Sequence, residues 1–292
     1  MSFTFLRSKQ FHRIINILSL VAIGLAAYYK LVEIKILESD IILSKGYYLI
    51  VLFLLAPFSW GIESARLKTL LDLSWRQSIL STMNGLLLRF IMASPGEMIG
   101  RQQYLPEGIN ARKNLASWTT LKYSAGLVSG MFGVLGMGFY GFEKFPILLE
   151  YNLVFISIFG LISILVFLFI RRLDKDMLLS KSFFEISVLH ACKFLILLVQ
   201  FVLAFKAFGL SYSSFEIISG MSLVLFLRSV IPVFHWIGEV GVREVGALYI
   251  FDVGHGEIML VTTAVFIVWF VNNILTSIGF WIYKVNILKW KQ

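Results

Sequence analysis

The sequence predicts an all-α polytopic integral membrane protein with about eight transmembrane helices, in two repeats that each contain a re-entrant or broken helix. The first observation is composition, because 58% of the 292 residues are hydrophobic and only 15% are charged. The mean hydropathy of +0.83 is far above that of a soluble domain. The second is the number of apolar runs that reach the roughly 20 residues needed to cross a bilayer. The third is a pair of Gly-Glu breaks inside such runs, at Gly96 and Gly238.

Eight apolar runs count as expected spans of a single transmembrane domain over 1–292. The first has a basic start and an apolar centre, as a signal peptide does, but no good small-residue cleavage site follows it. Tyr28, Tyr29 and Lys30 instead indicate an interfacial belt at its end. The expected spans are approximately 12–30, 46–66, 78–94, 114–140, 147–170, 183–208, 213–233 and 257–283.

Two broken stretches interrupt the third and seventh expected spans. The first runs from Arg89 to Arg101 and reads RFIMASPGEMIGR; the second runs from Arg228 to Phe251 and reads RSVIPVFHWIGEVGVREVGALYIF. An unpaired backbone group in hydrocarbon costs several kcal/mol, so irregular chain at membrane depth needs cover from protein or water. Both stretches are therefore expected to be re-entrant or broken helices beside a polar site.

The two breaks belong to a longer internal similarity, which predicts repeats over 1–146 and 147–292. Leu73-Ser74-Trp75 matches Leu210-Ser211-Tyr212 at an offset of 137, Arg89 matches Arg228 at 139, and Gly96-Glu97 matches Gly238-Glu239 at 142. Transporters often place a substrate site between such repeats. Whether the repeats are parallel or inverted depends on whether a re-entrant segment counts as a crossing.

The net charge of +9 comes from basic residues spread over loops and span ends. This spread favours contact with anionic lipid headgroups over nucleic acid binding. With eight crossings, Lys and Arg number eleven on each side, so the positive-inside rule leaves the orientation open. The basic ends favour cytoplasmic termini in a multi-pass protein of the cell (inner or plasma) membrane. The sequence leaves open whether the protein forms a homo-oligomer.

Charged residues inside the spans are the candidates for function. The basic ones are Arg89, Lys122, Lys193 and Arg228. Each costs about 3 kcal/mol to insert unpaired, so each needs a partner. The acidic residues near that depth are Glu63, Glu97, Glu239 and Glu244. Structural ion pairs are one interpretation, and recognition of an anion by some of these cations is the other.

Arginine and glycine next to the breaks favour the second interpretation. A guanidinium offers a planar fork of donors suited to phosphate, and a helix that begins after a Gly-rich break presents free amides to the same ligand. The glutamates would orient the arginines. The predicted substrate-binding residues are Arg89, Gly96, Glu97, Arg101, Arg228, Gly238, Glu239, Gly241, Arg243 and Glu244.

Motifs for catalysis or metal binding are absent from the sequence. There is no GxSxG, no phosphate loop ending in Lys-Ser/Thr, no HExxH and no Cys/His cluster. No catalytic residue, metal site or cofactor is therefore predicted, which favours a lipid transporter over an enzyme.

The stretch IGEVGVREVGALYIFDVG resembles the flippase-like transmembrane region of the lysylphosphatidylglycerol synthase family and its stand-alone relatives. Gly241, Val242, Arg243 and Glu244 match the Gly-Val-Arg-Glu of that family, and Pro95-Gly96-Glu97 with Arg101 match its earlier break. The sequence departs from the pattern at His235-Trp236-Ile237, where the family has proline and glycines. The resemblance implies movement of a phosphate-bearing lipid between leaflets, without lysyl transfer, because the soluble synthase domain is absent.

The predicted function is therefore a flippase-like translocase for a phosphate-bearing lipid, such as an anionic phospholipid or a polyprenyl phosphate carrier. Two alternatives stay open. One is an integral-membrane glycosyltransferase that uses a lipid-linked donor, and the other is a membrane accessory subunit that transports nothing.

Overall fold

The computed structural model describes residues 45–140, 152–174, 177–178, 181–230, 236–254 and 257–289. This part of the chain is helical and contains no strand, which confirms the all-α class. The expected first span, 12–30, lies outside it. The helices are α3 (Tyr47–Leu71), α4 (Trp75–Gln102), α5 (Ala111–Tyr140), α7 (Asn152–Leu173), α8 (Lys181–Ala207), α9 (Ser214–Val230), α10 (Trp236–Ile250), α11 (Ile258–Phe270), the π-helical turn η2 (Val271–Leu275) and α12 (Thr276–Lys289).

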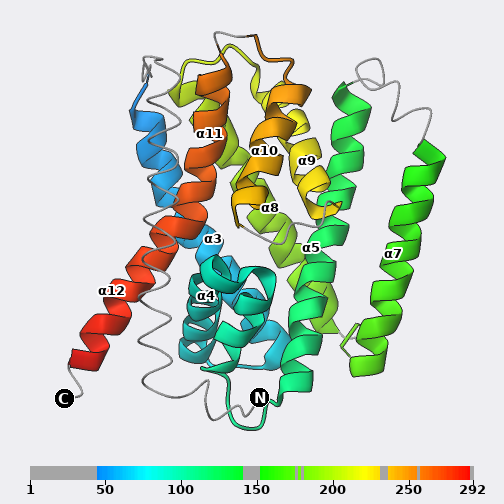
Figure 1. The fold of residues 1–292 in the computed structure, drawn as a ribbon, viewed down its shortest axis with the longest axis vertical. Coiled ribbons are helices and arrows are strands. Elements are labelled where there is room, and N and C mark those ends of the chain that lie inside the picture. Colours follow the sequence, from blue (N-terminus) through cyan, green and yellow to red (C-terminus); the bar gives the residue numbers. More distant parts are fainter. Residues whose placement is uncertain are drawn as a thin grey trace.

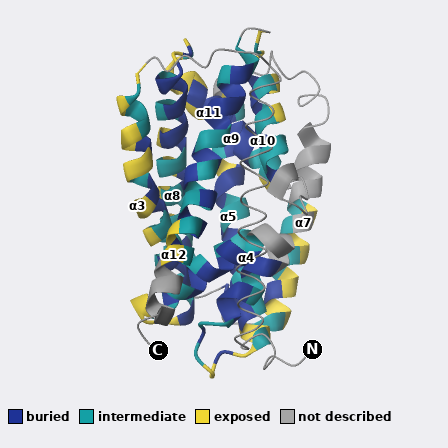
Figure 2. Ribbon diagram, turned by 60° about the vertical axis from the view of Figure 1, so that its left-hand side comes forward, coloured by how far each residue is buried: buried dark blue, intermediate teal, exposed yellow. Residues whose placement is uncertain are grey.

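The surface of the bundle is apolar and its interior is partly polar. Leu54, Phe58 and Phe184 are more than half exposed, while Ser78, Asn84 and many other polar side chains are buried. Figure 2 shows exposed residues along the outer sides of the helices and buried ones in the middle. Among the described residues, three helical stretches are long and apolar enough to cross a membrane: Tyr47–Leu71, Lys181–Ala207 and Ile258–Ile282. Soluble proteins show the opposite distribution, so these features indicate membrane association.

The long helices alternate in direction between two ends of the bundle, called upper and lower as drawn in Figure 1. α3, α7 and the α11–η2–α12 stretch run from the upper to the lower end, and α5 and α8 run the other way. Contacts between helix ends agree with this. At the upper end the amide of Lys45 donates to the carbonyl of Ala207 (3.2 Å), and at the lower end the Arg112 side chain donates to the carbonyl of Arg172 (2.8 Å).

The chain doubles back within α4 and so forms a helical hairpin, the first hairpin. In a straight helix Gly85 and Gly100 would be about 22 Å apart, since each residue advances 1.5 Å. Instead a Cβ on Gly100 would lie 2.8 Å from the Cα of Gly85, and the side-chain amide of Asn84 donates to the carbonyl of Gly100 (2.8 Å). The chain therefore reverses between Gly85 and Glu97. Glycines are required at this contact because a side chain would strike the opposite backbone.

α9 and α10 form the second hairpin. Gly220 faces the side chains of Ile250 and Phe251, and Gly246 faces Val224, which is the pattern of two antiparallel arms. The tip, 231–235, lies outside the described residues. The first hairpin lies at the lower end and the second at the upper end, and both point toward the middle of the bundle (Figure 1). Each hairpin thus brings the chain back to the end of the bundle from which it starts.

Both hairpins begin with the same local signal. Ser74 caps α4, where its hydroxyl accepts from the amide of Gln77 while the Gln77 side chain bonds back to Ser74. Ser213 and Glu216 make the same reciprocal pair before α9. Such a capping box satisfies amides that the first helical turn leaves free. An arginine follows 15 residues after each capping serine, at Arg89 and at Arg228.

A neutral polar connection joins α3, α8 and η2 within the apolar bundle. The Gln200 side chain on α8 donates to the carbonyl of Leu52 (3.2 Å) and accepts from the Asn272 side chain (2.8 Å). Asn272 lies in the π-helical turn, where it also donates to the carbonyl of Val268 (2.9 Å). These bonds link the helices in a medium that offers no competing water.

Candidate functional site

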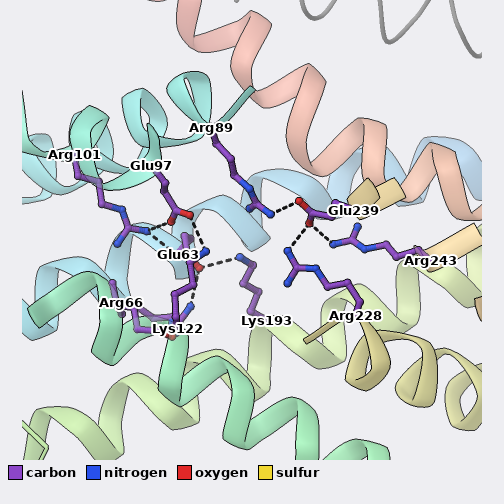
Figure 3. A network of polar contacts seen from close by, with 11 residues as sticks. Glu63, Arg66, Arg89, Glu97, Arg101, Lys122, Lys193, Arg228, Glu239 and Arg243 are labelled. Carbon is purple, nitrogen blue, oxygen red and sulfur yellow. Dashed lines mark hydrogen bonds and ion pairs between the residues drawn. The ribbon is translucent and has the colours of Figure 1, made fainter. Parts of the chain in front are cut away.

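A network of charged side chains occupies the middle of the bundle, where the two hairpins meet (Figure 3). Apolar clusters lie on either side of it. Along α3, Leu52 and Ala56 belong to one cluster and Leu67 and Leu71 to the other, with Glu63 between them. The charges thus lie between two apolar clusters, about midway along the bundle.

Glu239 near the start of α10 accepts hydrogen bonds from three arginines. Arg228 from α9 donates at 2.5 Å, Arg243 from the next turn of α10 donates at 2.8 Å, and Arg89 from the first hairpin donates to the second carboxylate oxygen. Glu239 thus pairs with both arginines of its own hairpin, Arg228 and Arg243. The bond from Arg89 joins residues 150 positions apart and links the two hairpins directly.

Glu97 and Glu63 form the other two centres of the network. Glu97 accepts from Arg101 on its own helix (2.5 Å) and from Lys122 on α5 (2.7 Å). Glu63 on α3 accepts from Lys193 on α8 (2.8 Å), and Arg101 also reaches it at 3.4 Å. Arg101 thereby connects the two carboxylates.

The third basic residue on Glu63 is Arg66, one turn further along α3, which donates at 2.8 Å. Its second terminal nitrogen donates to the carbonyl of Leu121 on α5, also at 2.8 Å. Arg66 is almost fully buried and links α3 to α5 as well as neutralising Glu63.

Each carboxylate has one deeply buried arginine on its own helix. These inner pairs are Glu63 with Arg66, Glu97 with Arg101, and Glu239 with Arg243, at spacings of three or four residues. The three arginine side chains are 2% to 9% exposed. Spacings of this kind put both members of a pair on one helix face. The inner pairs are therefore neutral units built into single helices.

Four further cations reach the same carboxylates from other elements. These outer cations are 17% to 39% exposed and so are more accessible than the inner arginines; they are Arg89, Lys122, Lys193 and Arg228. In Figure 3, Lys193 extends into the space between Glu63 and Arg228. All four are residues that the sequence places inside spans.

The network carries a surplus of positive charge. Seven cations against the three carboxylates that accept their bonds leave 7 − 3 = 4 positive charges, all on the outer cations. Counting Glu244, which lies in α10 beside Arg243, would leave three. Buried guanidinium groups also keep donors without an acceptor among the described residues, at Nε and Nη1 of Arg101 and Nε of Arg243. The arrangement suits an anion with several acceptor oxygens.

The structure brings six of the ten predicted site residues into this network: Arg89, Glu97, Arg101, Arg228, Glu239 and Arg243. Gly96 is buried next to Glu97. Glu244 is half-buried in α10. The glycines do not open a new helix as expected, because α10 begins at Trp236 and α4 continues through Gly96. Among the predicted glycines, only Gly238 contributes one of the first four backbone amides of α10, which have no hydrogen-bond acceptor within the helix.

Gly241 has a different position from the one expected. It lies inside α10, where its amide is committed to the helix, and a Cβ there would meet nothing within 4 Å. It therefore neither presents an amide to a ligand nor permits a close helix contact.

Sequence reasoning left four network residues out of the predicted site. Glu63, Lys122 and Lys193 were identifiable as charges inside spans, but nothing in the sequence indicated their partners. Arg66 falls at the expected end of the second span, although α3 continues to Leu71 and buries it. Its spacing of three from Glu63 was the available signal.

Comparisons with protein family models, curated proteins and solved structures found no match. The resemblance to the lysylphosphatidylglycerol synthase family therefore stays a prediction. In the part of the chain that the structure describes, no group of three His, Cys, Asp or Glu residues is placed to hold a metal ion.

Proposed function

We propose that the chain is a multi-pass membrane translocase that moves a phosphate-bearing lipid between leaflets, with the headgroup bound at the charged network. The observation that carries this proposal is a surplus of positive charge, four or, with Glu244 counted, three, in an otherwise apolar bundle where four of the cations are partly exposed. A net positive charge at membrane depth is costly, and a structural role needs only one cation for each carboxylate. A bound phosphate group offsets this cost.

The two hairpins are proposed to be equivalent parts of an inverted repeat. One unit is α3, the first hairpin and α5; the other is α8, the second hairpin and α11–α12. Three facts support this: the capping box, the arginine 15 residues later, and a glutamate with an arginine four residues beyond it. α3 and α8 run in opposite directions, as an inverted repeat requires. The hairpins would then enter the membrane from opposite sides.

The proposed topology favours one orientation, which eight simple crossings leave open. If both hairpins return to their own side, nine basic residues of the described chain lie at the lower end: Lys68, Arg76, Arg112, Lys113, Arg171, Arg172, Lys181, Lys284 and Lys289. Two lie at the upper end, Lys45 and Lys206. By the positive-inside rule the lower end faces the cytoplasm of a cell-membrane protein.

The test is a transport assay in vesicles that contain the purified protein and a chain-labelled anionic phospholipid or polyprenyl phosphate. Label in the inner leaflet is protected from an impermeant quencher, and translocation exposes it. We expect protein-dependent loss of protection, abolished by Arg228→Met. This change leaves Glu239 neutralised by Arg89 and Arg243, so folding should survive. Lys181→Gln, at a 90% exposed side chain, serves as the control that retains transport.

The accessory-subunit function has one observation in its favour, because all seven cations already hydrogen-bond to a carboxylate. On that alternative the network only holds helices together. Arg228→Met would then lower the thermal stability, and no anionic lipid would move. On the proposed function, removing a surplus charge leaves stability unchanged or raises it while transport is lost.

A further inference from the structure

The distribution of charge in the network narrows the class of headgroup that the proposed translocase binds. The inner pairs are neutral, so the ligand interacts with a field set by the four outer cations. These cations come from the first hairpin, α5, α8 and the second hairpin, and thus approach from four elements. A ligand that satisfies them needs both several oxygens and more than one negative charge.

Phosphate-bearing lipids differ in this respect. A phosphodiester headgroup such as that of phosphatidylglycerol carries one negative charge and lowers the surplus by one. A terminal phosphate carries about −1.5 to −2 near neutral pH and has three free acceptor oxygens. It lowers the surplus by about 1.5 to 2 and offers an oxygen to each of three donors. A diphosphate compensates the site further.

The identity of the outer cations points the same way. Arg89 and Arg228 bond to the same carboxylate, Glu239, one to each oxygen. Two guanidinium groups that share a carboxylate in this way are placed to share a second anion of similar size. Lys122 and Lys193 add compact ammonium charges from the opposite side of the network, at Glu97 and Glu63. Two planar guanidinium groups and two ammonium groups suit a phosphate whose non-bridging oxygens are all free.

We infer that the site, on the proposed function, selects lipids with a terminal phosphate monoester or diphosphate over phosphodiester lipids. The bound phosphate lies between Arg89, Arg228 and Lys193 and competes with Glu239 for the two arginines. Because Arg89 and Glu239 join the two hairpins, headgroup binding and the contact between the hairpins are then linked.

The test compares two lipids with identical labelled chains, phosphatidic acid and phosphatidylglycerol, in vesicles with the unmodified protein. Phosphatidic acid is expected to move roughly tenfold to a hundredfold faster, the range for one added hydrogen bond to a charged group. Equal rates, or faster phosphatidylglycerol, overturn the inference and leave the proposed function standing. Movement of neither, with movement of a labelled polyprenyl phosphate, supports the inference for a different lipid tail.

Two further experiments distinguish the phosphate of a lipid headgroup from free inorganic phosphate as the ligand. Millimolar inorganic phosphate should slow phosphatidic acid movement, whereas sulfate-free chloride buffer of equal ionic strength should not. Uptake of radiolabelled inorganic phosphate without movement of any lipid would overturn the lipid function while retaining the phosphate chemistry. If neither a lipid nor inorganic phosphate moves, both the proposed translocase function and the headgroup selection are refuted.

A pH series gives an independent readout. The dianion of a phosphate monoester takes up one proton with a pKa near 6, so its negative charge decreases from about −2 toward −1 as the pH is lowered from about 8 to about 5.5. The rate advantage of phosphatidic acid over phosphatidylglycerol should shrink over this interval, because the phosphodiester keeps its single charge. A constant ratio over the whole interval overturns the charge-based selection.

Discussion

Replacing Glu239 with glutamine should destabilise the protein strongly, because this carboxylate is the common acceptor for three arginines. Around Glu239 the present balance is three cations against one anion, a local charge of +2, and Glu239→Gln raises it to +3. The amide has nearly the same size, so the change acts through charge and not through packing. Removing one partner of a buried pair typically costs about 3–5 kcal/mol. At about 2–4 °C per kcal/mol, the melting temperature should fall by about 6–20 °C.

The assay is thermal unfolding of the purified protein in detergent, without added lipid. Glu185→Gln is the matched control, since Glu185 pairs with Lys181 across 3.7 Å on an exposed surface, where an ion pair contributes at most about 1 kcal/mol. The double change Glu239→Gln with Arg243→Met returns the local charge to +2 and should recover part of the loss. If Glu239→Gln unfolds within about 2 °C of the Glu185→Gln control, the buried pairing is not what stabilises the hairpin contact.

Three other outcomes are expected. Gly100→Ala should destabilise the first hairpin by about 1–3 kcal/mol, because its Cβ would lie 2.5 Å from the Asn84 carbonyl oxygen. The control is Gly61→Ala, whose Cβ would meet nothing within 4 Å and which should not lower the melting temperature. Arg228→Lys should keep the protein folded but reduce transport roughly tenfold or more, since lysine lacks the planar fork; an unchanged rate would mean that only charge matters. The orientation can be tested in a Cys192→Ser background with an impermeant maleimide. The reagent should label Ser211→Cys in intact cells and Arg76→Cys only after permeabilisation. The reverse pattern would place the lower end outside the cell.

The helices themselves were predictable from the sequence, because apolar runs of sufficient length leave few other solutions. The expected 114–140 and 183–208 agree closely with α5 and α8. The folding back of α4 was only partly predictable. Proline and glycine near Gly96 indicated a break, but the reversal depends on a tertiary contact between Gly85 and Gly100, 15 residues apart. No local pattern reports such a contact.

In the candidate site, some ion pairs follow from the spacing of residues on one helix, and others depend on residues far apart in the sequence. The pairs Glu97–Arg101 and Glu239–Arg243 follow from a spacing of four on one helix, so sequence alone places them together. The bond from Arg89 to Glu239 spans 150 residues and depends on how the hairpins meet. Arg66 was missed because it is the last residue of the expected span, where a basic side chain is assigned to the interface, although a buried carboxylate one turn earlier holds this arginine inside.

The meeting of two short hairpins in the middle of the bundle has an electrical consequence in the proposed topology. Polar access from both sides would narrow the insulating layer to the region of contact between the tips, so most of the membrane voltage would fall there. Each elementary charge that crosses the full voltage exchanges about 2.3 kcal/mol per 100 mV. A dianionic headgroup would therefore exchange about 4.6 kcal/mol per 100 mV while crossing the distance between Arg89 and Arg243. An interior-negative potential would drive such a headgroup outward with no other source of energy, and the direction of movement would follow the sign of the voltage.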